Sequence, residues 1–112
     1  MTLPLLNRKL VLEHAVRSPD RAGGYATRWE ALGTLWGEIT PGAGGERAAN
    51  ALALSRVPLR IVVRSAPAGS DARPTAGQRF REGPRIYTIL AVSDGDTRGR
   101  YLTCHAQEEV AR

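Results

Sequence analysis

The sequence predicts a mostly β protein, a small antiparallel barrel or sandwich of about seven short strands with one short helix in an inserted loop. Two observations carry this prediction. Short segments with alternating or β-branched apolar residues recur between turn residues along nearly the whole chain. Only one stretch is rich in helix formers. A chain of 112 residues is the size of one domain, so we expect a single domain over residues 1–112.

The first half of the chain predicts three strands before the insertion. Residues 8–16 alternate loosely, and the turn residues of 18–24 separate them from a partner strand over 25–31. Gly33 and Thr34 are expected to break that strand. A third strand then runs over 35–40 until Pro41, which cannot donate to a central ladder.

Residues 41–55 are expected to form a flexible insertion. Its first part, 41–45, is rich in glycine, and 46–54 contains the helix formers. Glu46 suits the positive end of a helix dipole. The apolar side chains of this segment are small, so we expect weak packing or a mobile loop.

The second half predicts four more strands. Residues 57–65 form the clearest of them, because Leu59, Ile61 and Val63 alternate with Arg60, Val62 and Arg64. Short strands over 78–81, 85–92 and 100–106 follow, with a turn at 93–99. The polar tail, 107–112, is expected to fray. Closure into a barrel would remove exposed strand edges from so small a protein.

Composition argues against several classes of function. The net charge is +5 and the isoelectric point about 10.3, which invites a nucleic-acid interpretation. However, the basic residues form no cluster of five, and nearly all are arginine, as coding bias in a GC-rich genome would produce. No run approaches the roughly 20 apolar residues of a membrane span, so no membrane partner is expected.

No catalytic or metal-binding constellation is evident. Cys104 and His105 would point to opposite faces of a strand and cannot form a dyad. Asp94 and Asp96 lack the further ligands of a calcium loop, and we interpret them as turn residues. The glycines of 42–45 lack the spacing of a phosphate-binding loop. We therefore expect no enzyme, no metal and no cofactor, and a hydrolase that uses His14 or His105 is a remote alternative.

The order of segments resembles the head–tail joining proteins of tailed phages, also called head-completion, head-closure or stopper proteins. The resemblance spans nearly the whole chain, and each piece is short. The matching segments are LNRKLVLE (6–13), PDRAGGY (19–25), Trp29, LWGEITP (35–41), GER (45–47), RIVVR (60–64), GQRF (77–80), RIYTI (85–89), Val92, Asp94 and RGRYL (98–102). The composition would suit a bacterial prophage or a gene transfer agent.

This resemblance implies a structural subunit of a particle neck that is assembled in the bacterial cytoplasm. Six or twelve copies would form a ring below the portal or adaptor proteins, close the channel around packaged double-stranded DNA, and dock a tail terminator or tail tube protein. Copies joined head to tail form a closed ring when the rotation from each copy to the next adds up to a full turn.

The resemblance also implies where contacts lie. The insertion would face the channel or a neighbouring subunit, although its small side chains form no obvious plug. The loop 65–76 is a second candidate for partner contacts. The candidate channel-facing or neighbour-contacting residues are Gly44, Gly45, Glu46, Arg47, Asn50 and Leu52, and the candidate subunit-interface residues are Trp29, Trp36, Arg60 and Arg64.

One alternative comes from another class of function. A small β-barrel could bind single-stranded nucleic acid if Tyr25, Trp29, Phe80 or Tyr87 were exposed on one sheet face beside arginines.

Overall fold

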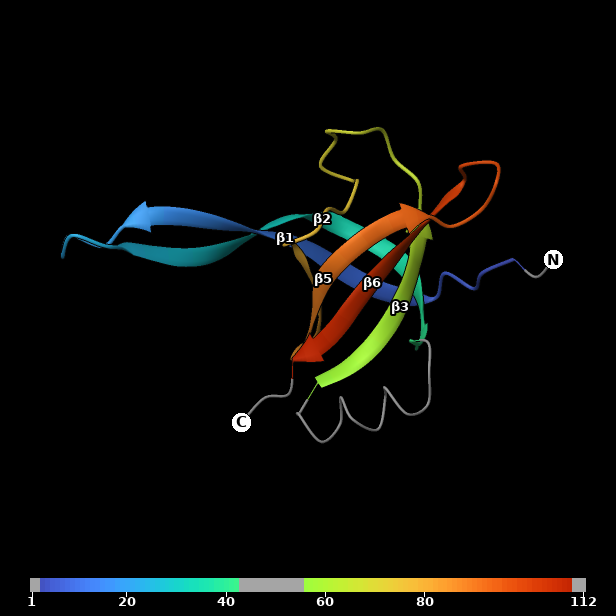
Figure 1. The fold of residues 1–112 in the computed structure, drawn as a ribbon, viewed down its shortest axis with the longest axis horizontal. Helices are drawn as coiled ribbons and strands as arrows, with labels where there is room; N and C mark the ends of the chain where they lie inside the picture. Colours follow the sequence, from blue (N-terminus) through green and yellow to red (C-terminus); the bar gives the residue numbers. More distant parts are fainter. Residues whose placement is uncertain (1–2, 43–55, 110–112) are drawn as a thin grey trace.

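The computed structural model describes residues 3–42 and 56–109, which form a closed antiparallel barrel (Figure 1). Its strand order around the barrel is β1-β2-β3-β6-β5-β4. The strands are β1 (Arg8–Pro19), β2 (Tyr25–Pro41), β3 (Arg56–Arg64), β4 (Arg79–Glu82), β5 (Arg85–Asp94) and β6 (Tyr101–Glu109). The predicted mostly β fold class is confirmed, and of the two architectures left open, barrel or sandwich, the structure is a closed barrel.

The barrel closes through its shortest strand. β4 pairs with β1 over three positions only, where Phe80 lies opposite Leu12. On its other side β4 pairs with β5, and Phe80 lies opposite Tyr87. Four residues therefore join the first strand to the second half of the chain.

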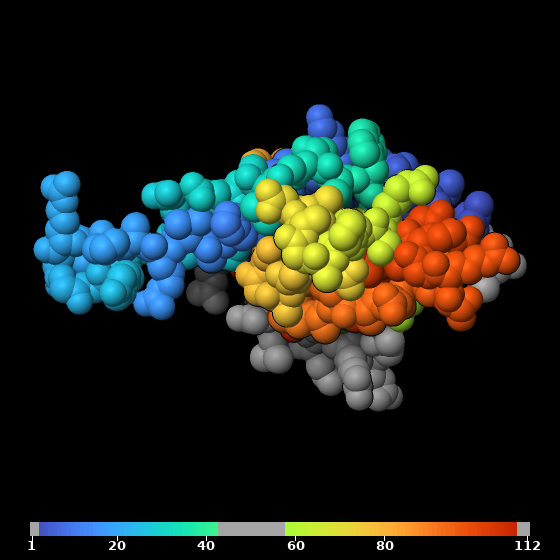
Figure 2. Space-filling view, turned by 90° about the horizontal axis from the view of Figure 1, so that it is seen from above, coloured from blue at the N-terminus to red at the C-terminus, as the bar shows by residue number. Residues whose placement is uncertain are grey.

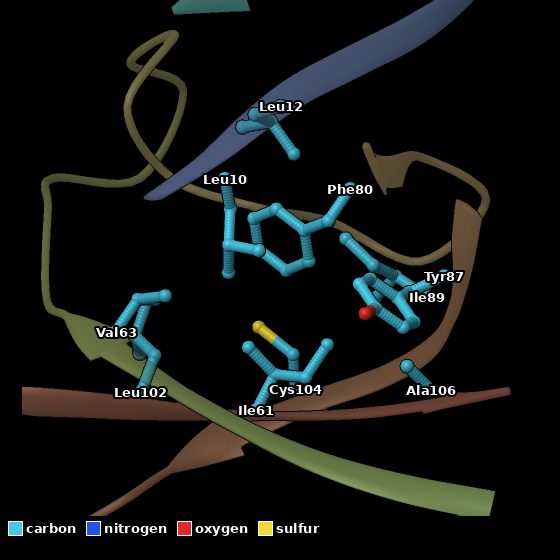
Figure 3. Packing of buried hydrophobic residues seen from close by; sticks show 10 residues of the cluster. All are labelled: Leu10, Leu12, Ile61, Val63, Phe80, Tyr87, Ile89, Leu102, Cys104 and Ala106. Atoms are coloured by element: carbon cyan, nitrogen blue, oxygen red, sulfur yellow. The ribbon is translucent and has the colours of Figure 1, made fainter. Parts of the chain in front are cut away.

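The barrel interior is filled with side chains (Figure 3). The alternation predicted on β3 is confirmed, since Ile61 and Val63 are fully buried while Arg60 and Arg64 are exposed. A barrel this small has room for its own core and not for a channel. The core consists of Leu10, Leu12, Ile61, Val63, Phe80, Tyr87, Ile89, Leu102, Cys104 and Ala106.

The strand count differs from the sequence prediction. Two strands were expected over 25–31 and 35–40, but β2 is one strand of 17 residues. The pairing register with β1 shifts instead, because Leu12 lies opposite Gly33 and Glu13 opposite Ala31. One extra residue, Leu32, is thus absorbed as a bulge. The helix predicted over 46–54 lies outside the described residues.

The C-terminal segment was also predicted wrongly in part. Residues 107–109 belong to β6 and do not fray, because they pair with both β3 and β5. Glu108 is held there by Arg85, whose guanidinium donates two hydrogen bonds of 2.6 and 2.8 Å. Residues 110–112 lie outside the described part.

A two-stranded arm projects from the barrel (Figures 1 and 2). We use this name for residues 14–31, the part of the β1–β2 hairpin beyond the closure with β4. Its tip is stabilised by Asp20, whose carboxylate accepts hydrogen bonds from the N–H groups of Ala22 and Gly24 at 2.8 and 3.0 Å. The arm makes the molecule elongated, with extents of 54 × 36 × 22 Å.

The loop between β5 and β6 is a turn, as predicted. The Asp96 carboxylate accepts hydrogen bonds from the backbone N–H groups of Arg100 and Tyr101 at 2.8 and 3.3 Å. Its role is therefore to hold the turn. Among the described residues, no helix has the length and apolar character to cross a membrane.

Candidate assembly surfaces

Two of the predicted interface residues come together on the barrel surface. Trp36 of β2 and Arg64 of β3 line one hollow of about 420 Å³, together with Leu6. The Trp36 side chain is prominent there, since the residue is 53% exposed. Tryptophan and arginine are enriched at protein interfaces, so this hollow is suited to a protein partner.

Arg60 lies in a second, larger hollow of about 500 Å³. β2 contributes Glu38 to it, and the turn before β6 contributes Arg100. Glu38 accepts a hydrogen bond of 2.8 Å from the backbone N–H of Leu5, which holds the N-terminal segment against the barrel. No acidic side chain of the described ranges forms an ion pair with Arg60 or Arg64, so both charges are available.

The fourth predicted interface residue, Trp29, stands apart from these hollows at the base of the arm. The guanidinium of Arg79 lies over its ring, 4.1 Å from the centroid. The six residues predicted in the insertion, Gly44, Gly45, Glu46, Arg47, Asn50 and Leu52, lie outside the described part of the chain.

The second candidate contact segment, loop 65–76, is folded back on itself. Arg73 donates a hydrogen bond of 2.9 Å to the carbonyl of Ala66, and Pro74 is buried. This loop presents an ordered surface to any partner.

A buried carboxylate joins β1 to β4 where the arm leaves the barrel. Glu13 of β1 accepts hydrogen bonds from Arg79 and Arg81 of β4 at 2.8 and 3.0 Å. Its side chain is only 7% exposed, beneath the arginine that stacks on Trp29. Burial alone would raise the pKa of Glu13, but the two arginine hydrogen bonds outweigh it and lower the pKa below its usual value.

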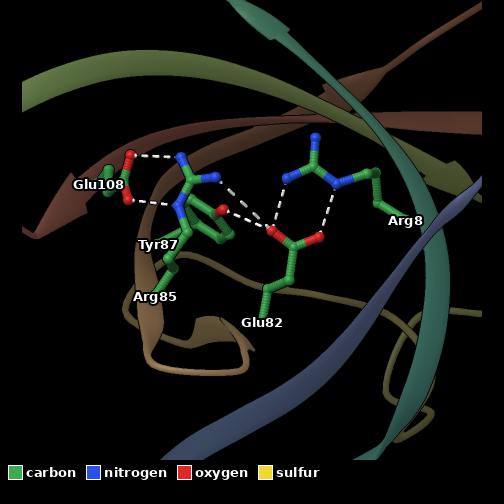
Figure 4. Close-up of polar contacts among 5 residues, drawn as sticks. All are labelled: Arg8, Glu82, Arg85, Tyr87 and Glu108. Atoms are coloured by element: carbon green, nitrogen blue, oxygen red, sulfur yellow. Dashed lines mark hydrogen bonds and ion pairs between the residues drawn. The ribbon is translucent and has the colours of Figure 1, made fainter.

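A second charged network closes one end of the barrel (Figure 4). Glu82 accepts two hydrogen bonds of 2.6 Å from Arg8 and one of 2.8 Å from the Tyr87 hydroxyl. These hydrogen bonds lower the pKa of Glu82 despite its partial burial. Because Arg8 is on β1 and Glu82 on β4, the network reinforces the same short closure that Glu13 supports.

Sequence reasoning assigned no role to either acidic residue, Glu13 or Glu82. One available signal was the placement of Glu13 directly after the apolar Leu10–Leu12 alternation. Its partners, Arg79 and Arg81, are 66 and 68 residues away, and no local pattern links them.

Cys104 and His105 are placed as predicted, on opposite faces of β6. Cys104 is fully buried in the core and His105 is exposed. Burial raises the pKa of the Cys104 thiol to about 12, which keeps it protonated and unreactive. The described residues contain no group of three or more side chains suited to hold a metal ion.

Replacement of Glu13 by Gln should make the free energy of unfolding less dependent on pH in the acidic range. A carboxylate whose pKa is lowered by folding contributes stability above its ordinary pKa of 4.5, and this contribution is lost as the pH falls through the lowered value. The wild-type chain should therefore be more stable than Glu13→Gln near neutral pH, with a gap that shrinks in acid. Urea unfolding across pH measures this gap.

Glu30 provides the matched control, because its side chain is 47% exposed and pairs only at the surface. We expect Glu30→Gln to change stability by less than about 1 kcal/mol at any pH. A Glu13→Gln gap that stays the same from neutral to acidic pH would contradict the assigned role of the buried carboxylate.

Comparison with known proteins gives two results beyond the fold. A family model described as phage head completion protein matches residues 1–109. A chain in the structure "Virion of native gene transfer agent (GTA) particle" is 51% identical, with a TM-score of 0.79 over 98% of this chain and 100% of that one.

A second solved structure, protein SF1141 from Shigella flexneri 2a, is 20% identical with a TM-score of 0.69, and the match covers all of both chains. At this identity the likeness concerns the fold alone. No match was found among curated proteins.

Proposed function

Because the chain belongs to the phage head completion protein family, we propose that it forms a ring in the neck of a phage-like particle, below the portal or adaptor proteins. The ring closes the DNA channel after packaging and docks a tail terminator or tail tube protein. The family is structural and not enzymatic, and a relative 51% identical to this chain comes from a gene transfer agent virion. The match over residues 1–109 is the observation that carries the proposal.

Because the barrel interior of each subunit is filled, any channel for DNA must lie between several subunits and cannot run through a single subunit. Ten side chains, each no more than 2% exposed, occupy the barrel interior, so DNA cannot pass through a single copy. A channel must then be enclosed by several copies arranged around an axis. Identical subunits joined head to tail enclose such a channel when the rotations between neighbouring copies add up to a full turn. Six or twelve copies would do so.

The barrel surface has side chains suited to contact with a neighbouring protein subunit and with DNA. The Trp36–Arg64 hollow suits a neighbouring protein subunit. Arg60 and Arg64 project from the outer face of β3 without an acidic partner among the described residues, so they can contact DNA phosphates irrespective of sequence.

The alternative, single-stranded nucleic-acid binding, has less support. Phe80 and Tyr87 are fully buried and cannot stack on bases. Tyr25 and Trp29 remain, but each already has a guanidinium over its ring, at 4.7 and 4.1 Å from the centroid. The four aromatic residues do not share one exposed sheet face.

Electron microscopy of purified particles with the gene present or deleted tests the proposal. With the gene, we expect a ring of density between portal and tail that increases in size when this protein is tagged. Without it, we expect loss of this density together with loss of tail attachment, because the tail then has no docking surface. The density also gives the copy number.

Complementation with the wild-type gene is the control for this experiment, and it should restore tailed particles. Normal tailed particles in the absence of the gene would contradict the proposed neck role.

A further inference from the structure

The arm leaves two strand edges unpaired in an otherwise closed barrel. β4 pairs with β1 only at residues 11–13, so no described strand covers the outer edge of β1 over 14–19. β3 pairs with β2 only at residues 37–41, which leaves the outer edge of β2 uncovered over 25–36. The arm thus carries one free edge on each side.

An isolated two-stranded ribbon is at best marginally stable in water. Natural proteins protect exposed edges with lysine, proline or inward-pointing charges. Within the arm, the two strands carry the exposed charged residues Arg17, Arg28 and Glu30, but they carry no lysine, and their single proline, Pro19, is at the tip, so it does not interrupt the unpaired backbone of either edge. These edges are therefore competent to pair with a further strand.

The two edges complement each other in direction. β1 and β2 run antiparallel, so β1 of a second copy, placed beside the outer edge of β2, would again be antiparallel to it. This arrangement uses two different edges of the same chain, which makes it a head-to-tail contact. Such contacts close into rings when the rotation between copies closes.

Side chains near the two edges also match in chemistry. One face of the arm carries Tyr25 and Trp29 on β2, and on β1 it carries Arg17, whose guanidinium lies 4.7 Å from the Tyr25 ring centroid. The opposite face carries Glu30 on β2 and His14 on β1, 3.7 Å apart. In a repeated sheet, Arg17 of one copy would again lie beside an aromatic ring of the next copy, and the His14 imidazole beside a carboxylate.

We propose that the outer edge of β1 in one copy pairs with the outer edge of β2 in the next, so that the arms form one continuous antiparallel sheet around the ring. The partner is a second copy of this chain. This inference rests on the proposed ring and identifies the segment that holds its subunits together. It also explains why the arm projects beyond the barrel without covering any of the described core.

Cross-linking in particles tests this contact. Two variants, Ala15→Cys and Thr27→Cys, are expressed together with tags of different size, and purified particles are treated with a short thiol cross-linker. Both positions are exposed and lie on the same face of the arm, one on each edge strand. Each chain carries one accessible cysteine, because Cys104 is fully buried. Every product therefore joins two chains.

In the matched control, Ala26→Cys takes the place of Thr27→Cys. Ala26 is also exposed, and it lies on the opposite face of the arm. We expect a mixed product from the same-face pair at least roughly ten-fold more abundant than from the opposite-face pair, because adjacent residues of a strand point to opposite faces.

The other outcomes overturn the inference in distinguishable ways. Products between two Ala15→Cys chains alone would indicate symmetric pairing of β1 edges, which does not continue around a ring. Absence of cross-links in particles that contain the protein would show that the arms do not pair, while the neck role stands. Absence of the protein from particles would contradict the proposed function itself.

Discussion

Replacement of residues 43–54 by a short Gly-Ser linker leaves the barrel folded and yields particles that leak DNA or lack tails. We expect the barrel to fold without this segment, because ten buried side chains of the described residues already fill its interior. The flanking strands already meet, since the N–H of Gly42 donates a hydrogen bond of 3.0 Å to the carbonyl of Pro58. The expected defect follows from the proposed role of the insertion at the channel or at a neighbouring subunit.

Circular dichroism during thermal unfolding measures the fold of this variant, and electron microscopy with a nuclease-protection assay measures tails and retained DNA. A second variant keeps the length by replacing 43–54 residue by residue with Gly and Ser, which separates the effect of length from that of the side chains. Unfolding of the linker variant would show that the segment belongs to the core. Tailed, DNA-filled particles would show that it has no part in closure.

Replacement of Phe80 by Ala is expected to lower the free energy of unfolding by roughly 3–5 kcal/mol, the range for large aromatic truncations in a core. This is a large share of the roughly 5–15 kcal/mol that stabilises a typical domain. The position is critical because Phe80 is fully buried on β4, opposite both Leu12 and Tyr87. Its loss opens a cavity at the short strand that closes the barrel.

Urea unfolding of the purified chain measures this change. Leu90→Ala is the matched control, since Leu90 is 50% exposed on β5 and its truncation should cost less than about 1 kcal/mol. Equal losses for the two variants would contradict the assignment of Phe80 to the centre of the core.

Period-2 patterning explains why the fold class was predictable from sequence. On β3, alternate positions carry Ile61 and Val63 facing inward and Arg60 and Arg64 facing outward, and this pattern needs no knowledge of distant residues. The same logic correctly placed Cys104 and His105 on opposite faces of their strand, and the structure buries Cys104 and exposes His105. The resemblance to head-completion proteins also rested on the linear order of segments, which the family match over residues 1–109 bears out.

The candidate interface residues were chosen by residue type. Which of them lie close together in the fold could be predicted only in part. Arg60 and Arg64 share a face because they are on one strand. Trp36 joins Arg64 in one hollow because β2 pairs with β3, whereas Trp29 lies on the arm, seven residues away along the same strand.

The sequence by itself determined the mostly β class, the alternating faces of β3 and the absence of a paired Cys104–His105 dyad, because these depend on local alternation. Tertiary structure decided that β2 continues through Gly33 and that Glu13 is buried beneath Arg79 and Arg81. It also decided which edges of the arm remain free. Strand register, a bulge and an ion pair across more than sixty residues are set by partners far away in the chain, and a local pattern contains no information about them.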